Sequence, residues 1–208
     1  MRLGLDADEV LTTTRSVRKR LDLERPVERE VIEECLDIAL QAPTGSNAQG
    51  WQWVFVTDPE KKKVVADFYG ANYDKYTNRP DQPQYGVDDP RTAQRPKIMD
   101  SSRYLREIFH QVPVMMIPCI QGQGRLDSGV PTFGQASAWG SILPAVWSFM
   151  LALRERGLGS AWTTLHLPNE KEVADLLGIP FDTVTQAGLF PIAYTTGTDF
   201  KLAKRLPG

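Results

Sequence analysis

A basic cluster near the start of the chain is the first set of residues whose types suit ligand binding. Arg15, Ser16 and Arg18 place two guanidinium groups and one hydroxyl within four positions. Guanidinium groups match phosphate oxygens in pairs, so phosphate is the natural ligand of such a cluster. If the segment is extended, Arg15 and Arg18 point to opposite sides, and one of them is free for a different acceptor. A nucleic-acid patch is a weaker interpretation, because Asp22 and Glu24 soon cancel the charge.

A second candidate site lies between residues 42 and 56, where small, polar and turn-forming residues separate an expected helix from an expected strand. Pro43 ends the helix, and Gly45 and Gly50 permit backbone angles and close approaches that a side chain would forbid. The loop also crowds several polar side chains into one turn: Thr44, Ser46, Asn47 and Gln49. Such a loop can hold a ligand, although a plain helix stop and turn explains it equally well when it is taken alone.

The histidines and tyrosines have ordinary structural explanations beside their chemical ones. His166 could donate a proton, but a single histidine beside a strand end is more often structural. His110 lies near an expected helix end, where dipole and packing roles suffice. Five tyrosines could line a pocket, although no spacing distinguishes them from core or surface residues: Tyr69, Tyr73, Tyr76, Tyr85 and Tyr104.

The sequence lacks the motifs of several common enzyme classes. There is no GxGxxG after a strand, no Walker loop, no GxSxG elbow and no HExxH, which removes the main support for dehydrogenase, kinase, serine hydrolase and zincin functions. Cys35 and Cys119 are far apart without metal-like spacing, and only two histidines are present. Any catalysis is therefore expected to need a bound cofactor.

Length and composition favour one globular domain over residues 1–208. The chain is 41% hydrophobic and 24% charged, with a formal net charge of −2, so neither nucleic acid nor an anionic membrane is an expected partner. No secretory signal is recognisable, and a cytoplasmic location is expected. The stretch 136–153 carries no charge and is barely long enough to span a bilayer. Its small and polar residues favour a buried core helix, packed against the monomer or against a second copy of the chain.

Hydrophobic periodicity and capping residues predict the elements that position these groups. We expect helices over 6–13, 28–41, 58–69, from Ser101 or Ser102 past 109, 136–153 and 169–177, and strands over 51–57, 114–120, 160–165 and 187–194. Asp6 with Glu9 forms a capping box for the first helix, and Asp58 with Pro59 starts the third. Gly70 and Gly178 are expected to end the third and the last. The polar segments 71–97 and 121–133 are expected to be surface excursions or lids. This alternation predicts an α+β fold, with a sheet wrapped by helices.

Four motifs, in this order along essentially the whole chain, together resemble the FMN-dependent nitroreductase family. They are Thr14-Arg-Ser-Val-Arg18, Ala42-Pro-Thr-Gly-Ser-Asn-Ala-Gln-Gly-Trp51, Gly157-Leu-Gly-Ser-Ala-Trp-Thr-Thr-Leu165 and Lys204-Arg-Leu-Pro207. The resemblance implies an α+β homodimer with a central, mostly antiparallel sheet and two FMN sites at the subunit interface.

The resemblance also implies roles for the basic residues. Arg15 and Ser16 would bind the flavin phosphate and ribityl chain, and Lys204 and Arg205 would form a C-terminal phosphate clamp. Arg18 would lie near flavin N1 and the C2 carbonyl, where a fixed cation stabilises the negative charge of reduced flavin. Many family members have a further arginine where this chain has Thr14, so the phosphate is expected to depend more on the clamp.

Two further groups of residues follow from the same resemblance. One is the loop that reaches across to the flavin of the partner subunit, formed by Thr44, Gly45 and Asn47 with Pro43 and Gln49 beside them. The other is the strand end whose backbone covers the ring edge and donates to N5 or the C4 carbonyl, formed by Thr163, Thr164 and Leu165.

The expected reaction is hydride transfer from NADH or NADPH to FMN N5, followed by reduction of a small electron-poor acceptor over the same face of the flavin. Nitroaromatics and quinones are the acceptor classes that the resemblance suggests, and one shared face implies ping-pong kinetics. Such a reaction needs proximity and electrostatics more than a protein acid or base. Two alternatives stay open: an FMN storage protein with little turnover, and a reductive dehalogenase. Dehalogenation would need lid residues that hold a charged substrate, for which Asp74, Lys75 and Arg79 are candidates.

Overall fold

A five-stranded sheet forms the centre of the computed structural model, which describes residues 2–122, 124–127 and 129–206. The strand order is β1-β2-β5-β3, and β4 also pairs with β2. Every pairing between these strands is antiparallel, as the resemblance implied. The strands are β1 (Trp51–Val56), β2 (Val114–Gln121), β3 (Leu158–Ser160), β4 (Val184–Gln186) and β5 (Phe190–Tyr194).

The central strand β2 is apolar on both sides, which explains its continuous hydrophobic run. Successive side chains of a strand point to opposite faces, and β2 divides its residues between two hydrophobic cores. Val114, Met116 and Ile120 enter one core, while Met115, Ile117 and Cys119 enter the other. The predicted central strand is thus confirmed.

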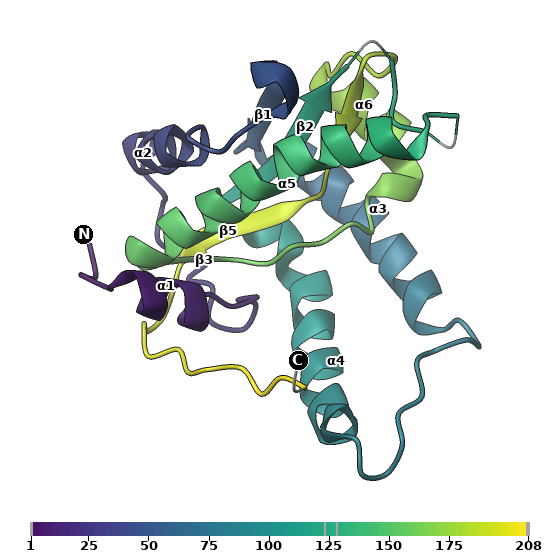
Figure 1. Ribbon diagram of the computed structural model, residues 1–208. Coiled ribbons are helices and arrows are strands. Elements are labelled where there is room, and N and C mark those ends of the chain that lie inside the picture. The colour runs from purple at the N-terminus through teal and green to yellow at the C-terminus, as the bar shows by residue number, and fades with distance from the viewer. Residues whose placement is uncertain (1, 123, 128, 207–208) are drawn as a thin grey trace.

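Helices cover both faces of the sheet and make three layers (Figure 1). Helices α2 (Arg29–Ala39) and α5 (Thr132–Glu155) pack on one face, and α3 (Pro59–Thr77), α4 (Pro90–Ile108) and α6 (Glu170–Leu177) on the other. The short α1 (Ala7–Thr13) begins with the expected capping box between Asp6 and Glu9. The 3-10 helices are η1 (Gly45–Asn47), η2 (Phe109–Gln111) and η3 (Leu167–Asn169). The α+β prediction is confirmed.

Helix α5 is long and apolar enough to cross a membrane by length and composition alone. Its inner side nevertheless belongs to the protein core, where Ile142, Val146 and Phe149 are fully buried. Its outer side is open, with Phe133 80% and Trp147 39% exposed. The helix is therefore a core helix on one side and carries an uncovered apolar face on the other.

The segment 71–97 is mostly helical, which corrects the expectation of a long excursion. Helix α3 continues past Gly70 to Thr77, and α4 starts at Pro90, so only residues 78–89 lie outside helices. Gly70 was expected to end the helix, but it is buried inside α3 with the Arg106 guanidinium beside it. A bidentate contact between Arg106 and Asp74 then joins α4 to the extended part of α3.

Helix α4 also begins earlier than its serines suggested. Asp89 caps the helix by accepting a hydrogen bond from the Arg91 amide, with Pro90 in the first turn. The expected caps Ser101 and Ser102 lie within the helix instead, where their hydroxyls donate to carbonyls three residues earlier. A polar helix with an internal proline gives little apolar periodicity from which its start could be predicted.

The last strands differ from the expected pattern in a way that shapes the candidate site. Strand β3 ends at Ser160 rather than near 165, and the expected strand 187–194 is preceded by β4 and interrupted at 187–189. Strands β4 and β5 therefore pair with the same neighbour, β2, on either side of a break. The expected loop 121–133 lies between β2 and α5, with residues 123 and 128 outside the described part.

Candidate functional site

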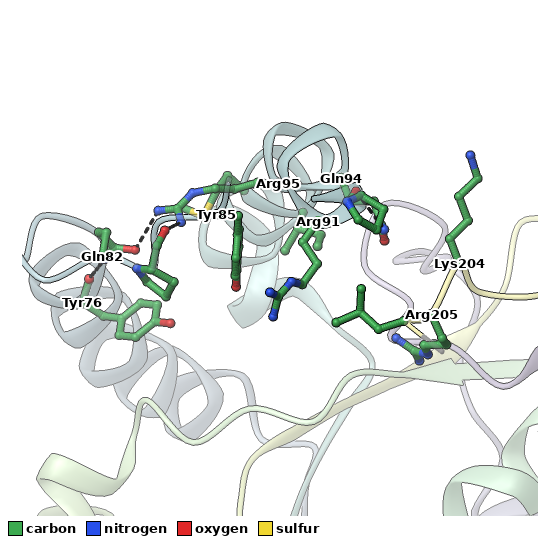
Figure 2. A pocket seen from close by; sticks show the side chains of 13 residues that line it. Tyr76, Gln82, Tyr85, Arg91, Gln94, Arg95, Lys204 and Arg205 are labelled. Atoms are coloured by element: carbon green, nitrogen blue, oxygen red, sulfur yellow. Dashed lines mark hydrogen bonds between the residues drawn. The ribbon is translucent and has the colours of Figure 1, made fainter. Parts of the chain in front are cut away.

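Two adjoining cavities lie between α3, α4, the turn at 163–165 and the C-terminal tail. The inner cavity, of about 330 Å³, is lined by Arg18, the tyrosines of α3 and the turn. The outer cavity, of about 520 Å³, lies between residues 82–95 and the tail (Figure 2). Tyr76, Ile98 and Met99 line both, so the two cavities adjoin across a shared wall, and together they are called the hollow below.

The segment 15–18 is fixed by its contact with β3. Val17 is buried, and its amide donates to the Ser160 carbonyl at 2.8 Å. Gly159 makes this approach possible, because a Cβ at that position would lie only 2.8 Å from the Val17 Cβ. Since Val17 faces the core, Arg18 on the other side of the extended chain reaches the inner cavity.

Arg18 carries a charge at the wall of the inner cavity without a carboxylate partner. Its Nη1 atom donates to the Ser101 hydroxyl at 3.4 Å, and no ion pair involves it in the described ranges. Burial lowers the pKa of Arg18, although the nearby Tyr69 and Tyr73 hydroxyls oppose that shift. A guanidinium remains charged at neutral pH despite such a shift, so this cation is held ready for a ligand.

The tyrosines of α3 are site residues whose placement the sequence did not predict. Tyr69, Tyr73 and Tyr76 line the inner cavity at spacings of four and three residues, which is one face of a helix. The Tyr73 hydroxyl shares a 2.9 Å hydrogen bond with Ser102, and burial raises the pKa of Tyr69 to about 12. Their spacing was a usable signal, but it was missed because Gly70 was interpreted as the helix end.

The turn at 163–165 is positioned by the break between β4 and β5. Thr163 and Leu189 exchange two backbone hydrogen bonds of 3.1 and 2.8 Å, and the Thr163 hydroxyl also donates to the Leu189 carbonyl. Gly188 is required there, since a Cβ would lie 3.0 Å from Trp162 Nε1. Thr164 and Leu165 follow at the cavity wall, and within the described part of the chain their amides donate to no protein acceptor.

Three cations gather at the tail end of the hollow. Lys204 and Arg205 line the outer cavity, and Arg15 lies close enough that the positive charge of Arg205 adds to burial in lowering its pKa. Among residues that the structure describes, none of the three forms an ion pair. Mutually repelling cations without carboxylates are typical of an anion site, for which a phosphate would be a suitable ligand.

The loop at 43–49 lies away from this hollow. The Gly45 amide donates to Ser141 Oγ on α5 at 3.0 Å, and the same glycine packs against Ser137. In Figure 1, η1 lies beside the start of β1, at the opposite end of the molecule from the tail and the start of α4. The structure therefore separates one predicted group from the cavities of the same chain: Pro43, Thr44, Gly45, Asn47 and Gln49.

The loop has a strained backbone. Ser46, Asn47 and Gln49 have φ values of 53°, 52° and 50°, in the left-handed region that residues other than glycine rarely adopt. Internal hydrogen bonds support them: the Gln49 amide donates to Thr44 Oγ1 at 3.1 Å and the Gln49 side chain to Asn47 Oδ1 at 3.0 Å. Clusters of such strain are typical of functional sites, which makes a plain turn the weaker explanation.

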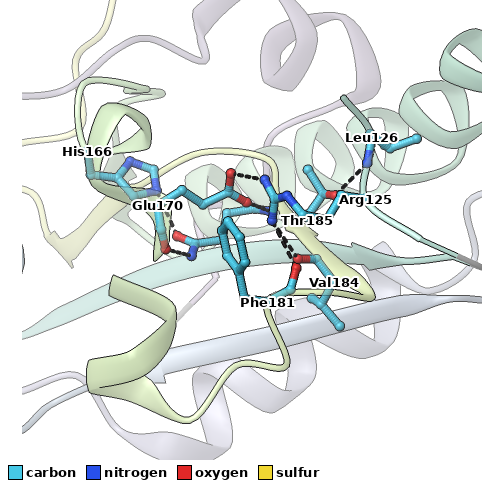
Figure 3. A network of polar contacts seen from close by, with 8 residues as sticks. Arg125, Leu126, His166, Glu170, Phe181, Val184 and Thr185 are labelled. Carbon is cyan, nitrogen blue, oxygen red and sulfur yellow. Dashed lines mark hydrogen bonds and ion pairs between the residues drawn. The ribbon is translucent and has the colours of Figure 1, made fainter. Parts of the chain in front are cut away.

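His166 belongs to a buried polar network rather than to the cavity wall (Figure 3). Its Nε2 contacts Gln186 Oε1 at 3.1 Å, and burial lowers its pKa to about 4. The backbone amide of Gln186 donates to Glu170 Oε1 at 2.8 Å, and Glu170 pairs with Arg125 at 2.5 Å. The histidine is neutral at physiological pH, and its contact with Gln186 holds the chain in place directly after Leu165. The expectation of a structural role for His166 is confirmed.

Two of the three charged candidates for holding a substrate, Asp74 and Arg79, already form ion pairs with other residues. Asp74 pairs with Arg106, and Arg79 pairs with Asp81. The outer cavity instead presents residues of the first turns of α4, which the sequence had assigned to a loop. Figure 2 shows Tyr85 and Arg91 turned toward each other, with Lys204 and Arg205 on the other side of the hollow.

Comparison with known proteins gives a consistent result. A model of the nitroreductase family matches residues 11–194. An iodotyrosine deiodinase from Thermotoga neapolitana is 25% identical over 185 residues, which cover 88% of this chain and 86% of that protein. Among solved structures, a BluB-like flavoprotein from Clostridium difficile 630 has a TM-score of 0.71 at 17% identity, covering 98% of this chain and 96% of that one. The FMN and NADPH-dependent nitroreductase NfnB from Sphigopyxis sp. strain HMH has a TM-score of 0.64 at 24% identity, covering 92% and 89%.

Proposed function

The chain belongs to the nitroreductase family, and on that premise we propose that it is an FMN-dependent oxidoreductase that uses NADH or NADPH to reduce small electron-poor acceptors such as nitroaromatics or quinones. The observation that carries the proposal is the hollow itself. Within the described residues, one end of it has a half-buried guanidinium without an ion-pair partner and two amides that donate to no protein acceptor, and the other end has three cations without ion pairs.

The residues present fit FMN in both chemistry and arrangement. Arg15, Lys204 and Arg205 would hold the phosphate, and Ser16 is exposed beside Arg15. The ring edge would lie in the inner cavity, held by Arg18 and by the backbone of the turn: Thr163, Thr164 and Leu165. Bound FMN supplies a carrier for a hydride, which none of the amino-acid side chains can provide.

The chain's own contribution is electrostatic and steric. Arg18 offers a fixed positive charge where negative charge would develop, and partial burial strengthens that effect by reducing its screening. The rings of Tyr69, Tyr73 and Trp162 supply an aromatic wall of the inner cavity against which a flat ligand would pack. No acid or base is required, and His166 takes no part because it is neutral and lies outside the wall.

We further propose a homodimer joined along the open face of α5. Its exposed positions recur at spacings of three, four, four and three residues, which is typical of a helix seam: Phe133, Ala136, Gly140, Pro144 and Trp147. The small residues allow a second helix to come close. Because the 43–49 loop rests on Ser137 and Ser141 of the same helix, a partner across this seam would receive the loop near its own hollow. Each FMN site would then use Thr44, Gly45 and Asn47, with Pro43 and Gln49, from the other subunit.

The cysteines agree with the cytoplasmic location that we propose. Cys35 and Cys119 are both buried free thiols, and burial raises the pKa of each to about 12. Such thiols are unreactive and suit a reducing compartment.

Flavin uptake and reduction test this function directly. Purified protein should take up added FMN and show an absorbance band at about 450 nm. Anaerobic NADH or NADPH should bleach that band, and a quinone should restore it. A protein that takes up no FMN overturns the proposal. A protein that binds FMN but is not reduced would be a storage protein.

Reductive dehalogenation is the second candidate, favoured by the similarity to the deiodinase. In that reaction an aryl carbon–iodine bond is replaced by a carbon–hydrogen bond, two electrons from the reduced flavin and one proton are consumed, and iodide leaves. Chemically reduced, FMN-loaded protein mixed with 3-iodo-L-tyrosine should release iodide if this candidate holds. Faster oxidation by a nitroaromatic, with no iodide released, favours the leading proposal.

A further inference from the structure

The C-terminal tail is held at one point well before the cations that line the hollow. After β5 the chain crosses the molecule and ends beside the start of α4 (Figure 1). Residues 197–206 form no helix or strand, and within the described ranges no hydrogen bond or ion pair reaches a side chain from 201 to 206. Phe200 is the last tail residue with strong contacts.

Two arginines from distant parts of the sequence hold Phe200. The Arg20 guanidinium lies 4.4 Å from the centre of the Phe200 ring, and the Arg154 guanidinium lies 5.0 Å from it. Each arginine also binds the tail nearby: Arg20 pairs with Asp199 at 2.5 Å, and Arg154 donates to the Thr198 carbonyl at 3.0 Å. The three side chains form an anchor on the tail.

Both arginines of the anchor also contact other parts of the fold. Arg154 is buried at the end of α5, where its Nε donates to Thr13 Oγ1 and burial lowers its pKa. Arg20 packs so closely against Gly197 that an added Cβ there would collide with its Nη2. Two like charges beside one ring are tolerated because Asp199 balances Arg20 and the ring face attracts cations.

The anchor limits where the terminal cations can lie. Lys204 lies four positions after Phe200, and an extended chain spans at most roughly 14 Å over that distance. Within the described residues, no hydrogen bond or ion pair holds the Lys204 or Arg205 side chain near Arg15, whose like charge repels that of Arg205. Without Phe200 in place, the tail would sample positions away from the hollow.

We propose that Phe200, held by Arg20 and Arg154, is a positioning residue that keeps Lys204 and Arg205 at the phosphate end of the flavin site. This inference rests on the proposed function. Loss of the anchor would weaken binding of the phosphate half of FMN and leave binding of the ring half unchanged.

Binding of FMN and of riboflavin, which lacks the phosphate, tests the anchor. Phe200→Ala should weaken FMN binding by about tenfold or more and riboflavin binding by less than about twofold, measured by titration of flavin fluorescence. Phe200→Tyr keeps the ring and should retain the wild-type preference for FMN. Leu202→Ala, at an exposed position of the same tail, is the matched control and should change neither affinity.

A readout without flavin covers the case in which the altered tail affects folding. Trypsin should cleave the apoprotein of Phe200→Ala after Lys201 and Lys204 faster than the wild type, while cleavage elsewhere stays unchanged. Equal loss of FMN and riboflavin affinity, or no loss of FMN affinity, would overturn the inference and leave the proposed function standing. A wild-type protein that binds neither flavin would overturn both.

Discussion

Val17 lies directly against the backbone of Gly159, so the segment that carries Arg15 and Arg18 is placed by the absence of a side chain on β3. Gly159→Ala should push this segment outward. We expect a loss of about 1–3 kcal/mol in the free energy of unfolding, from overpacking, together with weaker FMN binding. Denaturant titration and flavin titration measure the two effects. Gly124→Ala, where a Cβ meets open space, should change neither.

Arg18 should control flavin reduction more than flavin affinity. Arg18→Gln removes the charge beside Tyr69 and Tyr73, and the rate of flavin reduction by NADPH should fall by at least about tenfold. Arg18→Lys should recover part of the rate. Lys19→Gln removes the exposed ion pair between Lys19 and Asp100, one residue after Arg18, and should leave the rate of flavin reduction unchanged. Stopped-flow absorbance measures these rates, and equal rates for Arg18→Gln and the wild type would contradict the assigned role.

His166 should make stability depend on pH without affecting the reaction. Its folded pKa of about 4 lies below the ordinary 6.5, so the unfolded chain binds more protons between these values. Stability is full above pH 6.5 and falls as the pH drops toward about 4, by up to about 3 kcal/mol. His166→Asn should lose this dependence and keep the wild-type reduction rate. Urea unfolding at several pH values between about 4 and 6.5 measures this dependence. If the free energy of unfolding changes equally with pH in both proteins, the assignment to His166 is wrong.

The left-handed residues of the loop should carry measurable strain. A left-handed conformation costs a residue with a side chain roughly 1–2 kcal/mol, and a β-branched side chain tolerates it least. Ser46→Val should therefore lower the melting temperature of the apoprotein, whereas Ser46→Gly should keep or raise it. If the two variants melt at the same temperature, the loop is not strained in solution.

The open face of α5 should hold two subunits together. Gly140 has no atom within 4 Å of a Cβ, so Gly140→Arg can be accommodated within one chain but places charge on the seam. We expect this variant to be monomeric by light scattering and to bind FMN poorly, with Gly140→Ala as the dimeric control. A dimeric Gly140→Arg protein would locate the contact elsewhere.

Local chemistry made much of the fold predictable from the sequence. The capping box of Asp6 and Glu9, the Asp58–Pro59 pair and the left-handed Gly178 mark helix ends through contacts within a few residues. The apolar run of β2 likewise predicts a central strand. Helix α4 starts with a similar local pair, Asp89 and Pro90, but this signal was overlooked because the polar, proline-containing sequence that follows has little apolar periodicity.

The candidate site was predictable only in part. The resemblance indicated Arg18, the 163–165 turn and the terminal cations, and the structure brings these groups to one hollow. The tyrosines of α3 were considered as pocket residues but could not be singled out, because the helix was expected to stop at Gly70. The position of the loop depends on where Gly45 docks on α5, and a contact across 96 residues leaves no local signal.

A heterodimer with complementary defects tests the central claim, that each flavin site joins the cations of one subunit to the loop of the other. One subunit would carry Thr44→Ala and Asn47→Ala, and the other Arg15→Ala and Arg205→Ala, with separate tags for purification. Each homodimer should lose most of its FMN. The heterodimer keeps one unaltered site of two, so its flavin content should be about half that of the wild type. A heterodimer as poor in flavin as both homodimers would contradict the shared site.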